Sequence, residues 1–101
     1  PKQFLSRLGV DEIRLTLLPR LSSVEFQTLL LLGEGLNNRT IADQLDLSEA
    51  VIKSMVRSVL SKLHFRNRTE AGVFAARQQP SLEQARSAEA APPLAVRSSE
   101  G

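Results

Sequence analysis

The 101-residue chain contains no cysteine, tryptophan or tyrosine, and His64 is its single histidine. The absence of cysteine excludes a disulfide framework as well as thiolate metal and redox chemistry. One histidine leaves almost no material for a transition-metal site. We therefore expect neither a metal nor a cofactor, and we expect the chain to work in a reducing compartment, the cytoplasm.

Long hydrophobic segments are missing as well. The longest run of large apolar residues, Leu29 to Leu32, is far short of the roughly 20 residues that a membrane-spanning helix needs. Near the start of the chain Arg7 interrupts the apolar residues, so we expect no secretory signal and no membrane association. The chain begins with Pro1 rather than methionine, from which we expect a piece of a longer protein and keep open a preceding regulatory domain.

Aromatic residues are scarce, at 4% of the chain, whereas leucine occupies 17 positions and hydrophobic residues together make up 42%. This composition favours packed helices over a β-sandwich. The length fits a single domain. The predicted fold class is therefore all-α.

Charge is distributed unevenly along the chain, although the net charge is only +2. Residues 37–68 carry six basic side chains against three acidic ones, whereas residues 1–36 are balanced and residues 69–101 sum to −1. A positive excess in the middle third is typical of a protein that contacts a polyanion. An ordinary solvated surface produces similar counts about as often.

The two ends of the chain differ from its middle. Residues 80–101 are rich in Ala, Ser, Glu and Pro, so we expect a flexible, disordered tail in which residues 81–91 are at most transiently helical. Residues 1–19 combine Gly9 and Pro19 with apolar residues of mixed period. This pattern indicates an N-terminal extension that is either a linker or a half-formed helix, in which Phe4 to Leu8 could form one helical turn.

Residues 20–79 carry signals for four short helices. In the first, the Ser22 hydroxyl and the Glu25 carboxylate fit a capping box, and the helix runs through residues 32–34 until Gly35 ends it. Asn37 or Asn38 can cap the second helix, over residues 40–45. A tight turn at residues 46–48 then separates this helix from the next.

The third and fourth helices have equally clear beginnings. Ser48 is a good N-cap for a helix over residues 48–63, and Asn67 with Glu70 starts a fourth helix that Pro80 stops. Apolar residues recur along one face of the third helix, at Ile52, Val56, Val59 and Leu63. A short helix, a three-residue turn and a longer helix with a basic outer face form the helix-turn-helix arrangement of DNA-binding proteins.

The residues also match the pattern of a known family over about residues 20–78. The matching positions are Leu21-Ser-x-x-Glu25, Gly35, Asn38-Arg-x-Ile41-Ala42-x-x-Leu45, Ser48, Lys53, Lys62-Leu63 and Asn67-Arg68-x-Glu70-Ala71. In these the chain resembles the LuxR/GerE-type DNA-binding domain of bacterial transcription regulators. The resemblance implies a four-helix module whose third helix reads the major groove of double-stranded DNA and whose fourth often contributes to dimerisation.

Spacing assigns roles to the polar residues of this module. Lys53 and Arg57 lie four residues apart and so share one face of the third helix, with Ser54 beside them, where all three can reach base edges. Phosphate contacts are expected from five further residues. They are Arg39, the N–H groups behind Ser48, Lys62, Arg66 and Arg68. Arg68 can instead hold the loop before the fourth helix.

Two departures from the family pattern affect the third helix. Val51-Ile52 stands where the family commonly has Thr-Val, which removes a hydroxyl that could meet a phosphate, and Met55 replaces a frequent histidine. Met55 lies about 200° around the helix from Lys53, at 3.6 residues per turn, so it should pack rather than read bases. We expect weaker backbone anchoring and unchanged base readout.

The first helix carries an additional apolar stripe, at Val24, Phe26 and Leu30, where family members tend to be polar. Either residues 4–18 fold back and cover this stripe, or it docks a regulatory domain or a partner protein. The second interpretation leads to an alternative function: a protein-interaction module of helix-turn-helix origin that uses this face and binds DNA weakly or not at all.

The fourth helix combines small residues with Val73 and Phe74, and we expect it to form a homodimer. The dimerisation candidates are Val73, Phe74, Ala76 and Arg77. A two-fold dimer would place its recognition helices about 34 Å apart and require a pseudo-palindromic site. Alternatively, Val73 and Phe74 simply close the core of the monomer.

Other functions fit the sequence less well. The chain has no Cys nucleophile, no Gly-rich phosphate loop and no metal-ligand cluster, so we do not expect an enzyme. A free-standing promoter reader of the sigma-factor kind would not predict the Asn67-Arg68-x-Glu70-Ala71 signature. The interpretation is a bacterial transcription regulator that acts in the cytoplasm on nucleoid DNA.

Overall fold

The computed structural model describes residues 9–90, and within this range the chain is entirely helical, which confirms the predicted all-α class. The elements in chain order are α2 (Val10–Leu17), the 3-10 helix η1 (Leu18–Arg20), α3 (Ser23–Gly33), α4 (Asn38–Leu45), α5 (Glu49–Lys62), α6 (Arg68–Arg77) and α7 (Gln79–Ala90). The four expected helices are α3 to α6. None of the described helices has the length and hydropathy that a membrane crossing requires.

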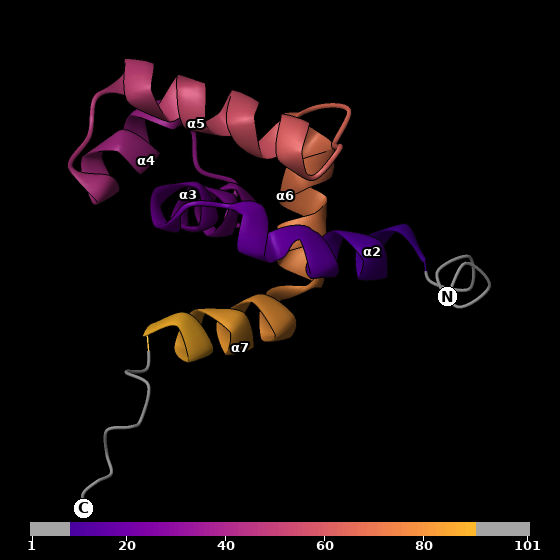
Figure 1. Cartoon of the computed structure of the whole chain (residues 1–101). Helices are drawn as coiled ribbons and strands as arrows, with labels where there is room; N and C mark the ends of the chain where they lie inside the picture. The colour runs from indigo at the N-terminus through magenta and orange to yellow at the C-terminus, as the bar shows by residue number, and fades with distance from the viewer. Residues whose placement is uncertain (1–8, 91–101) are drawn as a thin grey trace, which may run out of the picture.

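Helix α3 lies at the centre of the molecule. Figure 1 shows α5 along one side of α3 and α7 along the opposite side, with α6 running between the two sides. Leu29 of α3 and Ile52, Val59 and Leu63 on the inner face of α5 are buried. Phe74 of α6 completes this cluster. The stripe expected on the third helix is therefore the buried face of α5, and the opposite face of α5 lies on the surface.

The beginnings of α3 to α6 are set by their capping side chains. Ser22, Asn37, Ser48 and Asn67 each accept a hydrogen bond from the backbone N–H three residues further on. Ser22 and Glu25 form the complete capping box, since the Glu25 carboxylate also accepts the N–H of Ser22 at 2.8 Å. All four predicted helix starts are confirmed, and Asn37 rather than Asn38 is the cap of α4.

Three consecutive helices end in the same way. After α3, α4 and α5 a residue with positive φ turns the backbone, namely Gly35 (80°), Asp46 (59°) and His64 (61°). The N–H of the next residue then reaches back five positions, from Leu36, Leu47 and Phe65 to the carbonyl oxygens of Leu31, Ala42 and Leu60. This is the Schellman motif, in which an apolar residue follows the left-handed one. At His64 the left-handed backbone costs about 1 kcal/mol because the residue is not glycine.

The segment before residue 20 is more ordered than a linker. Residues 10–17 form α2, and Pro19 lies in the first turn of η1, where its missing N–H is not needed. Arg14 and Leu18 are buried against the rest of the domain. These tertiary contacts, which the local pattern does not encode, stabilise the helix. The expected turn from Phe4 to Leu8 lies outside the described residues.

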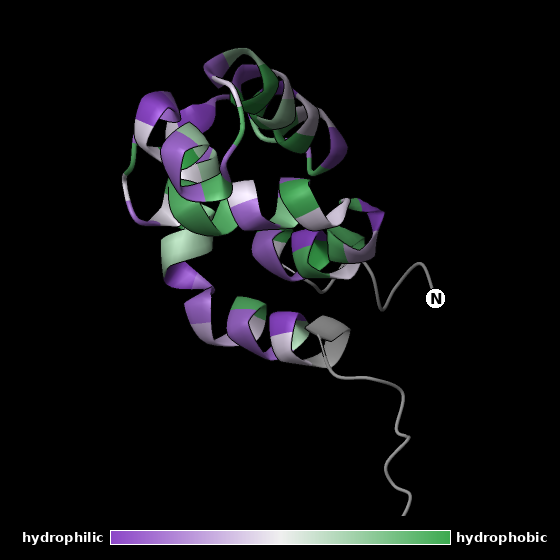
Figure 2. Cartoon of the chain, turned by 90° about the vertical axis from the view of Figure 1, so that its left-hand side faces the viewer, coloured by the Kyte–Doolittle hydropathy of each residue, from purple (hydrophilic) through white to green (hydrophobic). Residues whose placement is uncertain are grey.

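The disordered tail was expected to begin at residue 80, but the helical part of the chain continues past this residue. Pro80 does not end the ordered chain, because it occupies the first turn of α7, a position that suits proline. In Figure 2, α7 is mostly hydrophilic with one short hydrophobic stretch. Its Leu82 is fully buried, so one apolar side chain anchors a segment whose composition alone predicts disorder. The rest of the expected tail, residues 91–101, lies outside the described residues.

Helices α3 and α6 cross at very close range. A Cβ atom built on Gly33 would lie 2.7 Å from the Cβ of Ala75, and one built on Gly72 would lie 3.0 Å from the carbonyl oxygen of Leu32. Ala71 and Ala75 of α6 are buried at this crossing. Small residues of the fourth helix therefore allow close packing within the monomer.

We expect Gly33→Ala to destabilise the protein. Overpacking against α6 costs about 1–3 kcal/mol, which exceeds the gain in helix propensity of less than about 1 kcal/mol. Urea denaturation followed by circular dichroism measures the change, and Gln27→Ala, at an exposed position of the same helix, should stay within about 0.5 kcal/mol of the wild type. A Gly33→Ala protein as stable as the wild type would show that the crossing is loose.

Candidate nucleic-acid interface

Helices α4 and α5, joined by Asp46, Leu47 and Ser48, form the helix-turn-helix unit. The left-handed conformation of Asp46 reverses the chain after α4, and the Ser48 hydroxyl accepts the N–H of Val51 at 3.1 Å to start α5. Ile41 and Ala42 bury the inner face of α4. Because both helix ends are locally specified and both inner faces are packed, the outer face of α5 is held in a fixed orientation.

The outer face of α5 presents the three residues expected to read bases. Lys53, Ser54 and Arg57 are all exposed, opposite the buried residues Ile52 and Val56. No acceptor among residues 9–87 forms a hydrogen bond or an ion pair with the side chain of Lys53 or Arg57. These cations are therefore available to an external anion or acceptor.

Arg39 and Ser48 lie on the surface at the beginnings of α4 and α5, where phosphate contacts were expected. Arg39 has no side-chain partner among residues 9–87. Val51 remains 39% exposed and Leu47 37%, so an apolar pair stands beside the first turn of α5, where the family has a hydroxyl. Met55 is half-buried, in agreement with its expected packing role.

Lys62 is not free to meet a phosphate, which corrects its assignment. Its ammonium group lies 2.8 and 3.1 Å from the two carboxylate oxygens of Glu25 and 3.2 Å from the carbonyl oxygen of Arg20. Ser58, one turn earlier in α5, donates its hydroxyl to the same carboxylate at 2.6 Å. Lys62 therefore joins α5 to the beginning of α3, and its charge is neutralised there.

The Glu25 carboxylate is buried and remains ionised. Burial alone would raise its pKa, but hydrogen bonds from Lys62, Ser58 and the backbone of Ser22, together with the charge of Lys62, outweigh this effect and lower the pKa to about 2. The sequence predicts the capping role of Glu25. The contact with Lys62, 37 residues away, needs the tertiary structure.

Arg68 has a different role from the one expected, whereas the side chain of Arg66 lies on the surface, as a phosphate contact requires. The Arg68 guanidinium donates to the side-chain oxygen of Asn38 and, at 2.7 Å, to the carbonyl oxygen of Leu36. Arg68 thus fixes a loop, as the alternative proposed, although the loop is the one between α3 and α4. The backbone N–H of Arg66 donates to Glu70 at 2.6 Å, and its side chain is exposed.

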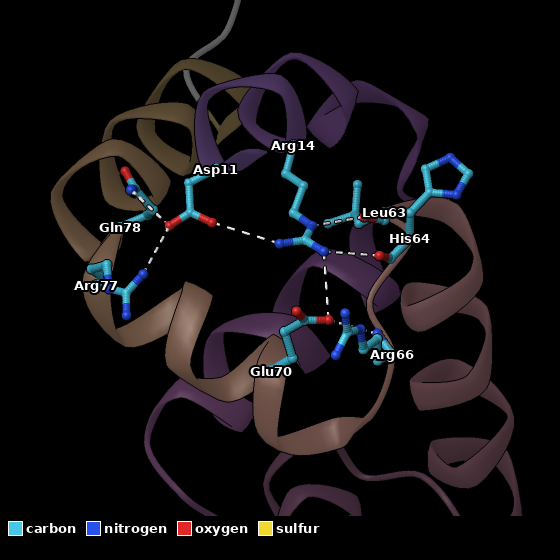
Figure 3. Close-up of polar contacts among 8 residues, drawn as sticks. All are labelled: Asp11, Arg14, Leu63, His64, Arg66, Glu70, Arg77 and Gln78. Carbon is cyan, nitrogen blue, oxygen red and sulfur yellow. Dashed lines mark hydrogen bonds and ion pairs between the residues drawn. The ribbon is translucent and has the colours of Figure 1, made fainter. Parts of the chain in front are cut away.

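Arg14 of α2, which sequence reasoning missed, is only 8% exposed. Figure 3 shows its guanidinium reaching the turn between α5 and α6, where it donates to the carbonyl oxygens of Leu63 at 3.0 Å and His64 at 2.8 Å. It also lies 3.6 Å from Asp11 and 3.5 Å from Glu70. The sequence gives one sign of this buried role: Arg14 lies between apolar residues, on a helix that is too short to be recognised from its pattern.

The residues expected to form a dimer divide into two groups. Phe74 is fully buried, and its ring packs at a tilt against that of Phe65, with 5.3 Å between the ring centroids. It therefore belongs to the core of the monomer and is no longer a dimerisation candidate. Val73 is 44% exposed, and Ala76 and Arg77 are exposed as well. Arg77 lies 3.4 Å from Asp11 of α2.

The apolar stripe of α3 is largely covered, which corrects the expectation of a docking face. Phe26 is only 5% exposed, and Val24 and Leu30 are half-buried. Phe26 lines a hollow of about 420 Å³ together with residues of α2, η1 and α7. Leu18 of η1 and the half-buried Ala85 of α7 belong to this lining. The first interpretation, in which flanking residues fold back over the stripe, therefore describes the structure, with α7 as an additional cover.

We expect the Glu25 cluster to make stability depend on pH. The pKa of Glu25 is lowered from 4.5 to about 2 in the folded state, so its stabilising effect is fully present above about pH 4.5 and is lost as the pH falls to about 2. Glu25→Gln should lower the free energy of unfolding at pH 7 by roughly 2–3 kcal/mol, and the two proteins should become equally stable only below about pH 2, the folded-state pKa of Glu25. Ser58→Ala should cause a smaller loss over the same window.

Urea denaturation at a series of pH values measures both variants. If the wild type and Glu25→Gln lose stability in parallel from pH 6 to pH 2, the carboxylate is not stabilised by its three donors, and the cluster does not connect α3 with α5.

Residues 19–75 match the family described as bacterial regulatory proteins, luxR family. The chain is 39% identical over 70 residues to the transcriptional regulatory protein LnrK of Bacillus subtilis, a match that covers 68% of this chain and 32% of LnrK. It is 50% identical over 50 residues to the DNA-binding transcriptional activator DevR/DosR of Mycobacterium tuberculosis, covering 48% of this chain and 23% of that protein. No solved structure matches the chain significantly.

The chain thus spans about a third or less of the length of these relatives. The matched residues contain α3, α4 and α5 in full and most of α6, whereas α2 and α7 lie outside them. With the family model covering more than half of the residues and the helix-turn-helix unit inside the matched region, the chain belongs to the luxR family of bacterial regulatory proteins.

Proposed function

We propose that this domain binds double-stranded DNA in a sequence-specific manner, as the output domain of a bacterial transcription regulator acting on nucleoid DNA in the cytoplasm. The observation that carries the proposal is the outer face of α5, where Lys53, Ser54 and Arg57 are exposed beside each other after a rigid helix-turn-helix turn. An α-helix fits the major groove, and this face is the one that would point into it.

Each of these side chains suits a contact with base edges. The Arg57 guanidinium can donate to O6 and N7 of one guanine, a bidentate contact that discriminates against other bases by about 1–3 kcal/mol. Lys53, one turn earlier on the same side, can reach a guanine or a phosphate. The Ser54 hydroxyl can donate or accept, so it suits any base or a phosphate oxygen.

The phosphate contacts are proposed to come from a smaller set than the sequence indicates. Lys62 and Arg68 are bound to Glu25 and to the loop before α4, so Arg39, Arg66 and the exposed N–H groups behind Ser48 remain. With few phosphate contacts, the affinity should depend only moderately on salt, because each neutralised phosphate adds to the salt dependence. Specificity would then depend mostly on Arg57 and Lys53.

A homodimer on DNA is part of the proposal. Val73 and Ala76 stand on the exposed side of α6, next to a hollow of about 390 Å³ that both of them line together with Leu36 and Thr69. An exposed apolar residue beside a hollow on the same face can pair with its own copy across a two-fold axis. Two recognition helices so related would read a pseudo-palindromic site.

The alternative function, a protein-interaction module, has less support. It depended on the stripe of Val24, Phe26 and Leu30, and Phe26 is buried beneath η1 and α7. The cations on α5, in contrast, have no partner among residues 9–87.

We expect Arg57→Ala to weaken binding to a DNA site selected from a random pool by about 10- to 100-fold and to relax the preference at one base position. Lys53→Ala should weaken binding as well, with a change at a neighbouring base or in the salt dependence. Fluorescence anisotropy titrations at two salt concentrations measure the affinities, and selection repeated with each variant measures the preference.

Arg86→Ala provides the control, since this exposed arginine lies on α7 and loses the same charge far from α5. It should bind the selected site like the wild type. If no site is enriched, and Arg57→Ala and Lys53→Ala bind every duplex as the wild type does, the proposed function fails.

We expect Val73→Asp to keep the fold and abolish dimerisation on DNA, because it places a charge at the centre of the proposed interface on an already exposed position. Sedimentation velocity with a pseudo-palindromic duplex should give two protein chains per duplex for the wild type and one for the variant. A wild type that stays monomeric at tens of micromolar, with and without DNA, would remove the dimer from the proposal.

A further inference from the structure

Arg14 is a buried cation that the proposed DNA interface does not use. It lies on α2, outside the residues that match the family, yet its guanidinium donates to the turn that follows the C-terminal end of α5. Four acceptors surround it: the carbonyl oxygens of Leu63 and His64 and the carboxylates of Asp11 and Glu70. With 8% exposure and these partners, it cannot reach a phosphate.

We propose that Arg14 is a positioning residue for the recognition helix: it holds the C-terminal end of α5 in the orientation that DNA binding requires. This inference rests on the proposed function, and it makes α2 a working part of the DNA-binding unit rather than a linker.

The first reason is the chemistry of the helix end. The last carbonyl groups of an α-helix have no partner within the helix, and they carry the negative end of its dipole. Arg14 supplies two N–H groups and a positive charge to the carbonyl oxygens of Leu63 and His64. A planar guanidinium can do both at once with fixed geometry, which a lysine cannot.

The second reason is the turn itself. His64 adopts the left-handed conformation although it is not a glycine, and Arg14 bonds the carbonyl oxygen of this strained residue. The same guanidinium lies over the ring of Phe65, 4.4 Å from its centroid. It therefore fixes three consecutive residues, 63–65, that set the angle between α5 and α6.

The third reason is that Arg14 adds a second polar anchor to this end of α5, on the turn that follows Lys62. The Glu25 cluster holds the flank of α5 that bears Ser58 and Lys62, and α4 packs against it nearer its beginning. Glu70, the first-turn acid of α6, accepts from both Arg14 and the backbone of Arg66. Without Arg14, α5 could tilt about the Glu25 cluster and carry Lys53 and Arg57 away from the base edges, which tolerate errors of only about 0.5 Å.

The test compares specific with non-specific binding in the full chain. Arg14→Lys keeps the charge but loses the fork of donors, and it should lower the ratio of affinities for a selected duplex and a scrambled duplex about tenfold. The affinity for the scrambled duplex should stay unchanged, since Arg14 contributes nothing to phosphate binding. Arg86→Lys, on the exposed surface of α7, is the matched control.

Two further measurements distinguish the proposed positioning role from a merely structural role of Arg14. All titrations are made at a temperature at which circular dichroism shows each variant fully folded, so that a loss of folded protein cannot imitate a loss of specificity. Amide hydrogen exchange should be faster at residues 63–65 in Arg14→Lys and unchanged in α3 and α4.

The outcomes are distinct. If Arg14→Lys keeps the wild-type ratio of affinities, or if exchange at residues 63–65 matches that of the wild type, the positioning role is overturned. If the wild type itself binds both duplexes equally, the proposed function fails, and the positioning role fails with it. A tenfold loss of the ratio together with faster exchange supports the proposal.

Discussion

One buried carboxylate connects the parts of this domain that have to stay together. Glu25 caps the beginning of α3, accepts the Ser58 hydroxyl from the middle of α5 and pairs with Lys62 near the end of α5. A buried charge is costly unless all its acceptor sites are filled, and here two helices supply the donors. The carboxylate can therefore be buried in its ionised form, with a pKa of about 2, only when α3 and α5 are in their native arrangement. The orientation of α5 thus depends on a buried residue of α3.

The requirement that a buried charge has partners also distinguishes two classes among the arginines and lysines of the domain. Arg14, Lys62 and Arg68 are bound to carboxylates or carbonyl oxygens and hold the helices together. Arg39, Lys53 and Arg57 are exposed and have no partner among residues 9–87. Composition cannot separate the two classes, since an excess of positive charge looks the same in both. The structure separates them because each structural cation has acceptors from a distant part of the chain, whereas Arg39, Lys53 and Arg57 are exposed on α4 and α5.

Sequence reasoning succeeded where the determinants are local and failed where they are tertiary. Ser22, Ser48 and Asn67 cap helices through bonds to residues three positions away, and Gly35 ends a helix through its own backbone, so these features can be read from short motifs. The spacing of Lys53 and Arg57 fixes their common face in the same way. The partner of Lys62 lies 37 residues away and that of Arg14 about 50, and α7 is ordered by the burial of one leucine, Leu82. Such contacts exist only once the chain has folded, so no local sequence pattern predicts them.

The flanking helices explain why a matched region of residues 19–75 is not the whole working unit. A domain of about 60 residues buries only about 60% of the surface that its unfolded chain exposes, so its stability is marginal. Helix α7 adds Leu82 to the core, and Ala85 of α7 lines the hollow beside the buried Phe26 together with Leu18 of η1. Helix α2 contacts the turn after α5 through Arg14. With these faces closed, the outer side of α5 and the exposed side of α6 remain for partners.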